Sequence, residues 1–323
     1  MKRALLVIAV LVASLAGLEA QNLSKTTRIG VFLSGSEASS REYLQGLEQG
    51  LADLGLVEGK NIQLELRYAN GQMERLDSVA VELARSGADI IFVGGDQATS
   101  AVKRATDKIP IVAVTCDALA AGLVTNLARP GGNITGVTCI NADLAAKRIE
   151  VIKEAIPSLS RIGVALNPSD KRMASELMEA ERAATAYLIS VQKLVVTKPE
   201  EIENAFSKAA ESGLGGVVIV FDSMTFFNRA KLAETAVRHR MPTIFNFRQY
   251  VDAGGLVSFG PNLRDMYRQS AHHILKVIKG EAPGDIPMEQ PTRFELVINL
   301  KTAKALGLTV PPSLITRADE VIE

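Results

Sequence analysis

Short apolar runs alternate with amphipathic segments along most of the chain. Runs such as Ile29–Leu33, Ala88–Val93 and Ile109–Thr115 contain no alternating polar positions, which is typical of strands buried on both faces of a parallel sheet. Between such runs, apolar residues recur every three or four positions, as in Arg41–Leu54, and predict helices. This alternation of strands and helices predicts an α/β protein whose parallel sheets are covered on both faces.

The pattern occurs twice, in the same order. Four segments of the first half have counterparts in the second: Arg28–Val31 and Arg161–Val164, Gly87–Val93 and Leu214–Val220, Ile109–Ile111 and Met241–Thr243, Gly132–Gly136 and Gly254–Ser258. We therefore expect two doubly wound, Rossmann-like domains joined by a hinge that the chain crosses several times. The expected first lobe is 27–140 plus 261–288, because the long helix predicted over Asn262–Lys279 returns to it. The second lobe is 141–260 plus 289–323.

Two helix starts carry a capping-box pattern, in which a hydroxyl residue is followed three positions later by a glutamate. Ser39 and Glu42 fit this pattern before the first predicted helix, and Thr197 and Glu200 fit it in the second half. Side-chain caps of this kind satisfy the free N–H groups of the first turn. We expect Ser39 and Thr197 to be the N-cap residues.

Composition narrows the class of partner. The chain has 323 residues, of which 47% are hydrophobic, and balances 36 basic against 36 acidic residues. A chain of this length can bury two cores. Balanced charge leaves no basic surface for nucleic acid or an anionic membrane. We therefore expect no nucleic-acid partner.

The first twenty residues read as a secretory signal peptide. Lys2 and Arg3 precede the apolar run Ala4–Ala13, and small residues lead to Ala20, a pattern typical of a cleaved export signal. The apolar run is too short to span a bilayer comfortably. No cysteine stands at the cleavage point, so we expect a periplasmic protein that is not a lipoprotein.

Ligands of doubly wound sheets bind beyond the carboxyl ends of the strands, and this rule nominates the candidate ligand-binding residues. They share hydroxyl, amide, carboxylate or guanidinium groups, or a glycine that admits close approach: Ser34, Ser36, Ser39, Ser40, Gly95, Asp96, Gln97, Thr99, Asp117, Asn167, Asp222, Thr225, Asn246, Arg248 and Tyr250.

Each candidate has a structural alternative. The serines can bind a ligand carboxylate or cap a helix. Asp117 and Asp222 can pair with a ligand ammonium or cap a helix, and the phenylalanines around Asp222 can form an aromatic wall or belong to the core. Arg248 can hold a carboxylate or lie exposed at a helix start. Tyr250 can stack on a ligand ring or simply pack.

Signals of catalysis, metal and cofactor are missing from the sequence. There is no G-x-S-x-G elbow, and none of the three histidines falls in a nominated segment. The Gly94–Thr99 segment matches neither the dinucleotide nor the P-loop spacing, and no metal-ligand spacing occurs. We expect a binding protein without catalytic activity, cofactor or metal.

Several long segments resemble one family of proteins. They are YLQGLEQGLADLGLVEGKNIQLELRYANG, LARPGGNITGVT, GGLVSFGPNLRDMYR and the final 35 residues from Glu289. They resemble the periplasmic substrate-binding proteins of ABC transporters, some of which bind tryptophan or phenylalanine. The resemblance implies a type I periplasmic-binding-protein fold, a small polar or zwitterionic ligand, with an amino acid as the leading candidate, and an ABC permease and ATPase as partners. The alternatives are a periplasmic protein that presents its ligand to a membrane receptor and, after it, an exported hydrolase. We expect a monomer.

One cleft segment departs from the family. Members usually have Gly-Asp-Pro or Ser-Asp-Pro where this chain has Cys116-Asp117-Ala118. Cys116 and Cys139, the only cysteines, each end a predicted strand, and these strands are expected to be neighbours about 4.8 Å apart. The pair can form a strained disulfide or remain two buried thiols.

Overall fold

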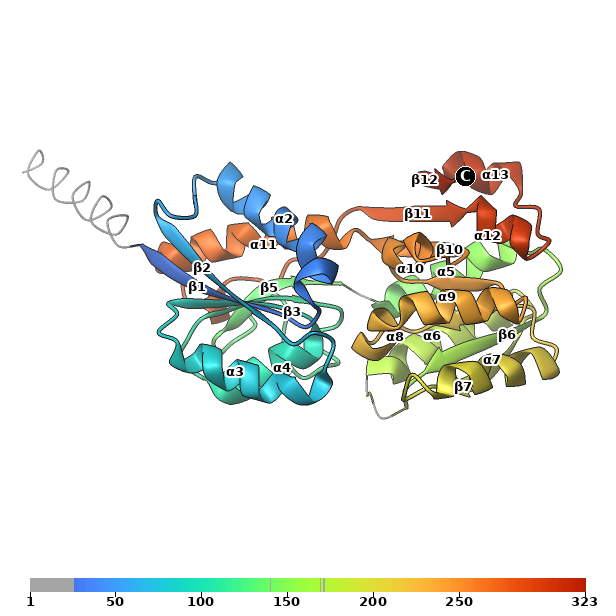
Figure 1. Cartoon of the computed structure of the whole chain (residues 1–323), viewed down its shortest axis with the longest axis horizontal. Helices are drawn as coiled ribbons and strands as arrows, with labels where there is room; N and C mark the ends of the chain where they lie inside the picture. The colour runs from blue at the N-terminus through green and yellow to red at the C-terminus, as the bar shows by residue number, and fades with distance from the viewer. Residues whose placement is uncertain (1–25, 140, 169, 171) are drawn as a thin grey trace, which may run out of the picture.

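The fold is known from a computed structural model, which describes residues 26–139, 141–168, 170 and 172–323. Two lobes lie side by side, each built around its own β-sheet with helices packed on it (Figure 1). The predicted α/β class with two parallel-sheet lobes is confirmed. The predicted signal peptide lies outside the described residues. Within those residues, no helix is long and apolar enough to cross a membrane.

The first lobe contains a sheet of parallel strands in the order β2-β1-β3-β4-β5. Their bounds are β1 Thr27–Leu33, β2 Ile62–Tyr68, β3 Ile90–Gly94, β4 Ile111–Thr115 and β5 Ile134–Thr138. Helices α3 (Leu76–Arg85) and α4 (Asp96–Ala105) cover one face, and α2 (Glu37–Asp53) and α11 (Leu263–Ile278) cover the other (Figure 1).

Helix α11 reaches the first lobe from a distant part of the sequence and packs along α2 (Figure 1). Two glycines of α2 allow this close approach. A Cβ added at Gly46 would lie 2.5 Å from the Arg264 carbonyl oxygen, and one at Gly50 would lie 2.3 Å from that of Arg268. The contact places the start of α11 beside the carboxyl ends of the first-lobe strands.

The second lobe contains a sheet in the order β12-β11-β10-β9-β8-β6-β7, in which β11 runs antiparallel to β10. The strands are β6 Arg161–Leu166, β7 Ser190–Val195, β8 Val217–Ile219, β9 Thr243–Phe245, β10 Val257–Pro261, β11 Phe294–Asn299 and β12 Glu320–Ile322. The helices are α5 Asn141–Ala155, α6 Arg172–Ala186, α7 Glu201–Glu211, α8 Ser223–Phe227, α9 Arg229–Arg238, α10 Arg248–Asp252, α12 Leu300–Ala305 and α13 Pro312–Arg317.

Alternate residues of the second sheet enter two different cores. Val217 and Ile219 pack in the core that contains α7 and α9, whereas Val218 and Val220 pack with α5 and α6. Because successive strand residues point to opposite faces, these helix pairs cover opposite sides of the sheet. This explains why the strand sequences are apolar without alternation.

The two lobes share one strand order. The order β2-β1-β3-β4-β5 of the first sheet has the same sequence of connections as β7-β6-β8-β9-β10 of the second, as the paired sequence segments predicted. Strands β11 and β12 extend the second sheet only. The chain passes to the second lobe after β5, returns with α11 and passes back before β11.

Both predicted capping boxes were wrong in register. Helix α2 begins two residues before the predicted N-cap, because the Ser36 hydroxyl accepts the N–H of Ser39 at 3.2 Å while the Ser39 hydroxyl accepts the N–H of Ser36 at 2.9 Å. Ser36 is therefore the N-cap. Before α7, the carboxylate of Glu201, not of Glu200, accepts the Thr197 N–H at 2.7 Å and the Thr197 hydroxyl at 2.9 Å.

Candidate ligand-binding site

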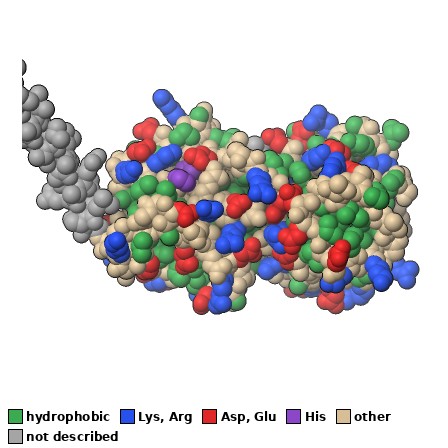
Figure 2. Space-filling view, turned by 90° about the horizontal axis from the view of Figure 1, so that it is seen from above, with side chains coloured by type: hydrophobic (Ala, Val, Ile, Leu, Met, Phe, Trp, Pro, Cys, Tyr) green, Lys and Arg blue, Asp and Glu red, His purple; other side chains and the backbone are tan. Residues whose placement is uncertain are grey.

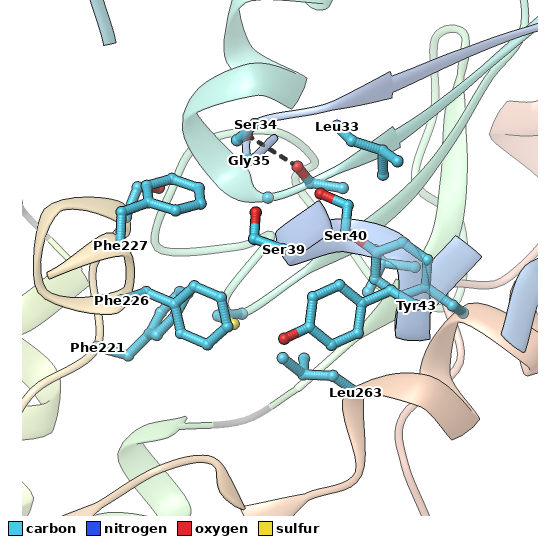
Figure 3. A pocket seen from close by; sticks show the side chains of 16 residues that line it. Leu33, Ser34, Gly35, Ser39, Ser40, Tyr43, Phe221, Phe226, Phe227 and Leu263 are labelled. Atoms are coloured by element: carbon cyan, nitrogen blue, oxygen red, sulfur yellow. Dashed lines mark hydrogen bonds between the residues drawn. The ribbon is translucent and has the colours of Figure 1, made fainter. Parts of the chain in front are cut away.

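A cavity of about 70 Å³ lies between the two lobes (Figure 3). This volume is several times the roughly 10–15 Å³ that a single water requires. The first lobe lines it with Leu33, Ser34, Gly35, Ser39, Ser40, Tyr43, Gly94, Gly95, Val114 and Cys116, the second with Phe221, Ser223, Phe226 and Phe227, and α11 with Leu263 and Tyr267. The carboxyl ends of β1, β3 and β4 therefore form one wall, as the strand-end rule predicted.

Small residues and hydroxyls shape the first-lobe wall. The hydroxyl of Ser34 donates a hydrogen bond of 3.1 Å to the carbonyl of Gly94 and ties the ends of β1 and β3 together. Gly95 has φ of +100°, a conformation that side chains rarely adopt. A Cβ at Gly94 would lie 1.8 Å from the hydroxyl oxygen of Tyr267. The wall thus depends on glycine at both positions.

Helix α8 carries the second-lobe wall. Its N-cap is Asp222, whose carboxylate accepts the N–H of Thr225 at 2.6 Å, while the Thr225 hydroxyl lies 3.0 Å from that of Tyr250. Both anchors are buried, and burial raises the pKa of Asp222 and of Tyr250. They hold Phe226 and Phe227, whose ring centroids are 5.9 Å apart and which face the cavity (Figure 3).

The two walls are in contact, so the lobes are closed on each other. The rings of Tyr43 and Phe226 approach to 6.4 Å between centroids. A Cβ at Gly35 would lie 3.1 Å from the ring of Phe227. The cavity is therefore bounded by both lobes.

Two wider pockets adjoin the cavity through shared lining residues. Ser39 lines the cavity and both pockets, and Arg229 lines both pockets. One pocket also contains Glu42, Gln249 and Asp252 and has a volume of about 310 Å³. The guanidinium carbon of Arg229 lies 5.1 Å from the ring centroid of Phe226, which is the geometry of a cation–π contact. Charged side chains of both signs therefore line the pocket that contains Arg229 and Glu42, whereas the inner cavity is lined by uncharged residues.

An ion-paired arginine joins the lobes on another side of the cleft. Arg172 of the second lobe contacts the Asp96 carboxylate of the first at 2.7 Å and also pairs with Asp170. Burial lowers the pKa of Arg172, but the two carboxylates outweigh burial and raise it above its ordinary value. Asp96 also accepts the N–H of Cys116 at 3.1 Å. These residues, except Cys116, line a pocket of about 400 Å³.

The structure places the predicted site residues in several groups. Ser34, Ser39, Ser40 and Gly95 line the cavity, and Ser36 lines an adjoining pocket. Asp96, Gln97 and Asn167 line the pocket beside Arg172. Asp117 lies in a smaller cavity with Cys116 and Glu176, and burial raises the pKa of Asp117. Asp222, Thr225 and Tyr250 stand behind the aromatic wall.

Three predicted residues make contacts elsewhere. The Thr99 hydroxyl donates to the Gly95 carbonyl at 2.7 Å within the start of α4. Asn246 is buried beside Arg148 and Glu176 inside the second lobe. The Arg248 guanidinium binds both carboxylate oxygens of Glu320 and also contacts Asp252.

The sequence reasoning missed several lining residues. Tyr43 lies one turn beyond Ser39 in α2. Because residues four apart share a face of a helix, its place in the cavity could have been predicted from that of Ser39. Leu263 and Tyr267 lie on α11, far from the strands in sequence, and Arg229 follows the short helix α8. Arg172 lies five residues past the nominated Asn167 and was not nominated. In the described part of the chain, no group of three or more metal-ligating side chains occurs.

Two similar α/β lobes that enclose a cavity at their strand ends define a type I periplasmic-binding-protein architecture, a class that binds solutes. The chain belongs to the ABC transporter substrate binding protein family, whose family model matches residues 28–322. It therefore has the role of a solute-binding component of such a transporter.

Individual relatives show what this family includes. A tyrosine-binding protein of Clostridioides difficile is 26% identical over 290 residues, which cover 88% of this chain and 82% of that protein. The solved ABC domain of Streptococcus pneumoniae in complex with L-Trp is 25% identical with a TM-score of 0.85, over 92% of this chain and all of that one. A conserved domain protein from Vibrio cholerae gives the same identity, TM-score and coverage.

Proposed function

We propose that the protein captures an aromatic amino acid between its lobes, leaves it chemically unchanged and delivers it to an ABC permease and ATPase. The observation that carries this proposal is the aromatic wall of the cavity, in which Phe221, Phe226 and Phe227 face Tyr43 and Tyr267. Offset aromatic contacts favour a ring over an aliphatic group of equal area. The tyrosine- and tryptophan-binding relatives support the same ligand class.

The distribution of charge orients the ligand. Moving a charged group into a space lined by uncharged residues costs several kcal/mol unless it is paired, so the ring takes the inner cavity. Ser39 lies where the cavity meets the outer pockets. The polar end of the ligand therefore lies at Ser39, with Arg229 available to its carboxylate and Glu42 or Asp252 to its ammonium group.

A ligand-binding assay tests the proposal. Protein that has been unfolded, stripped of ligand and refolded is titrated with L-tyrosine, L-tryptophan and L-phenylalanine, with L-alanine and L-leucine as comparison ligands. A true ligand at a thousandfold excess over Kd stabilises the protein by about 4 kcal/mol. The assay detects this stabilisation as a rise in melting temperature. Mass spectrometry of the recovered ligand should show no change. Stabilisation by L-leucine alone, or consumption of the ligand, would contradict the proposal.

Two arginines provide a matched pair of variants. Arg229 and Arg248 each begin a short helix of the second lobe, but only Arg229 lines the pockets next to the cavity. We expect Arg229→Gln to weaken binding of L-tyrosine by about 10-fold or more, since charge-assisted hydrogen bonds contribute about 1.5–3 kcal/mol. Arg248→Gln should leave the affinity unchanged. The reverse result would support Arg248 as the carboxylate-binding residue instead.

We infer export from residues 1–20. A signal peptide cleaved after Ala20 would place the mature protein in the periplasm, where members of this family meet their transporters. Intact-mass measurement of protein from the periplasmic fraction should show Gln21 as the first residue. Recovery of the uncleaved chain from the cytoplasm would contradict this inference.

A further inference from the structure

The two cysteines lie side by side at the ends of neighbouring strands. The register between β4 and β5 ends at Thr115 and Thr138, so Cys116 and Cys139 are the next residues on each strand. The Cys139 N–H donates to the Thr115 carbonyl at 3.0 Å, which continues the pairing beyond the strands. Neighbouring strands are about 4.8 Å apart, within the Cα separations that disulfides accept. Both thiols are free.

The side chains also face each other. Directly paired residues of neighbouring parallel strands point to the same face of the sheet, and both cysteines belong to one buried cluster with Val114 and Val137. Burial raises the pKa of the Cys116 thiol well above its ordinary value. The Cys139 thiol in turn donates to the Thr115 carbonyl at 3.4 Å. The two thiols therefore lie next to each other on one face of the sheet.

The pair occupies a functional position in two respects. Cys116 lines the ligand cavity beside Phe221, and it also lines the smaller cavity beside Arg172. Cys139 lies two residues before Asn141, where α5 of the second lobe begins. The thiols therefore lie between the ligand and one of the segments on which the lobes turn. Separation of the lobes exposes the cavity face of Cys116, and closure covers it.

Cationic side chains lie close enough to influence the thiols. Arg172 lines the same small cavity as Cys116 and lowers the pKa of its thiol, whereas the Asp96 carboxylate, which accepts the Cys116 N–H, raises that pKa. The fully buried guanidinium of Arg148 also acts on both cysteines. Neighbouring positive charge stabilises the thiolate, which is the form that takes part in disulfide exchange. Burial opposes this effect while the lobes are closed.

We propose that Cys116 and Cys139 are a redox-active pair that oxidises to a disulfide when the lobes are open and is protected when they close on a ligand. The oxidant is a low-molecular-weight disulfide, for which oxidised glutathione is the probe. The Cys116 thiolate attacks one glutathione sulfur, breaks the glutathione S–S bond and releases one glutathione. The Cys139 thiolate then attacks the Cys116 sulfur and releases the second glutathione. Two protein thiols are oxidised, one glutathione disulfide is reduced, and the two protons that the protein thiols lose are taken up by the two released glutathione thiolates.

Thiol counting on the ligand-free protein tests the disulfide. After incubation with oxidised glutathione, the protein should lose both thiols, measured in denaturant, and the mass of two hydrogen atoms. Cys139→Ser should stop at a mixed disulfide on Cys116. Cys116→Ser should remain unmodified at Cys139, which lines none of the cavities described here. Two free thiols in the treated protein, or one glutathione on each cysteine without a protein disulfide, would overturn the proposal.

The protection by closure rests on the proposed function, and it is tested separately with L-tyrosine. At a hundred times Kd, about one molecule in a hundred is ligand-free, so disulfide formation should slow about a hundredfold. An unchanged rate in a sample that calorimetry shows to be saturated would overturn the protection. If calorimetry shows no binding, the proposed ligand class fails, while the thiol count of the ligand-free protein still decides whether the pair oxidises.

Discussion

The two lobes share a strand order but differ at the strand ends that face the cleft. Strand β3 ends at Gly94, whereas the corresponding β8 ends at Ile219 and is followed by Val220 and Phe221. Strand β3 leads directly into α4, which has ten residues, whereas the five-residue helix α8 is inserted between β8 and α9. This insertion carries Phe226 and Phe227.

The difference shows how a repeated architecture makes an asymmetric site. The glycines of the cavity all come from the first lobe and allow close approach of a ligand, while the second lobe contributes three phenylalanine rings that face Tyr43 and Tyr267 of the first. Each lobe alone offers only part of the cavity surface. Binding energy therefore accrues only when the lobes close, which links recognition to the hinge.

The largest expected effect comes from removing the aromatic wall. Phe226 is 7% exposed and contacts Tyr43, Phe227 and Tyr250. Phe226→Ala should lower the free energy of unfolding by about 3–5 kcal/mol, measured by urea unfolding, and should also weaken binding of L-tyrosine. Phe206→Ala is the control, because Phe206 is buried in the same lobe without lining the cavity. It should lower stability by a similar amount and leave affinity unchanged. Equal losses of affinity in both variants would mean that Phe226 acts only through the core.

In the first-lobe wall, adding volume rather than removing it should weaken the protein. Gly94→Ala places a Cβ against the Tyr267 hydroxyl, and overpacking of this kind costs about 1–3 kcal/mol. The variant should also bind L-tyrosine more weakly because the cavity narrows. Adding Tyr267→Phe, which removes the hydroxyl, should restore part of the lost stability, measured by thermal unfolding. No recovery in the double variant would place the strain elsewhere.

Asp222 decides between a capping role and a ligand contact. Asp222→Ala removes the N-cap of α8 and should lower stability by about 0.5–2 kcal/mol. Asp222→Asn keeps the acceptor for the Thr225 N–H. Burial raises the pKa of the Asp222 carboxyl, which means that the buried negative charge is unfavourable. The variant, which has no such charge, should therefore be at least as stable at neutral pH. Its affinity for L-tyrosine should stay within about twofold of the wild type. A loss of affinity of more than about tenfold on Asp222→Asn would instead identify Asp222 as the partner of the ligand ammonium.

The fold was more predictable than the site, for physical reasons. Buried parallel strands are apolar throughout, so both sheets and their repeat were visible in the sequence. Local capping rules failed at Ser39, because Ser36 can also cap a helix and a serine, Ser39, takes the place of the usual glutamate in its box. Tyr267 and Arg172 reach the cleft through tertiary packing, which no local pattern records. The domain boundaries and the individual ligand contacts remain predictions.

The smallest effect concerns α11, the helix that a distant segment supplies to the first-lobe sheet. His273 is fully buried there, and burial lowers its pKa despite Glu289 at 3.9 Å; Lys276 acts in the same direction as burial. Its Nε2 atom lies 3.2 Å from the Pro287 carbonyl, and its Nδ1 atom has no partner among the described residues. The neighbouring His272 is exposed and provides the matched control.

A histidine whose pKa is lower in the folded protein binds fewer protons there than in the unfolded chain. Stability is therefore complete above the unfolded pKa of about 6.5 and is lost as the pH falls through it towards the folded value, by at most about 1.4 kcal/mol per pH unit. Glu289 titrates separately, since its pKa is lowered below that of an ordinary glutamate. Urea unfolding between pH 7.5 and about 5.5 should show this slope in the wild type and in His272→Gln, and a flatter one in His273→Gln. An equal slope in all three proteins would mean that the pKa of His273 is not lowered in the folded protein.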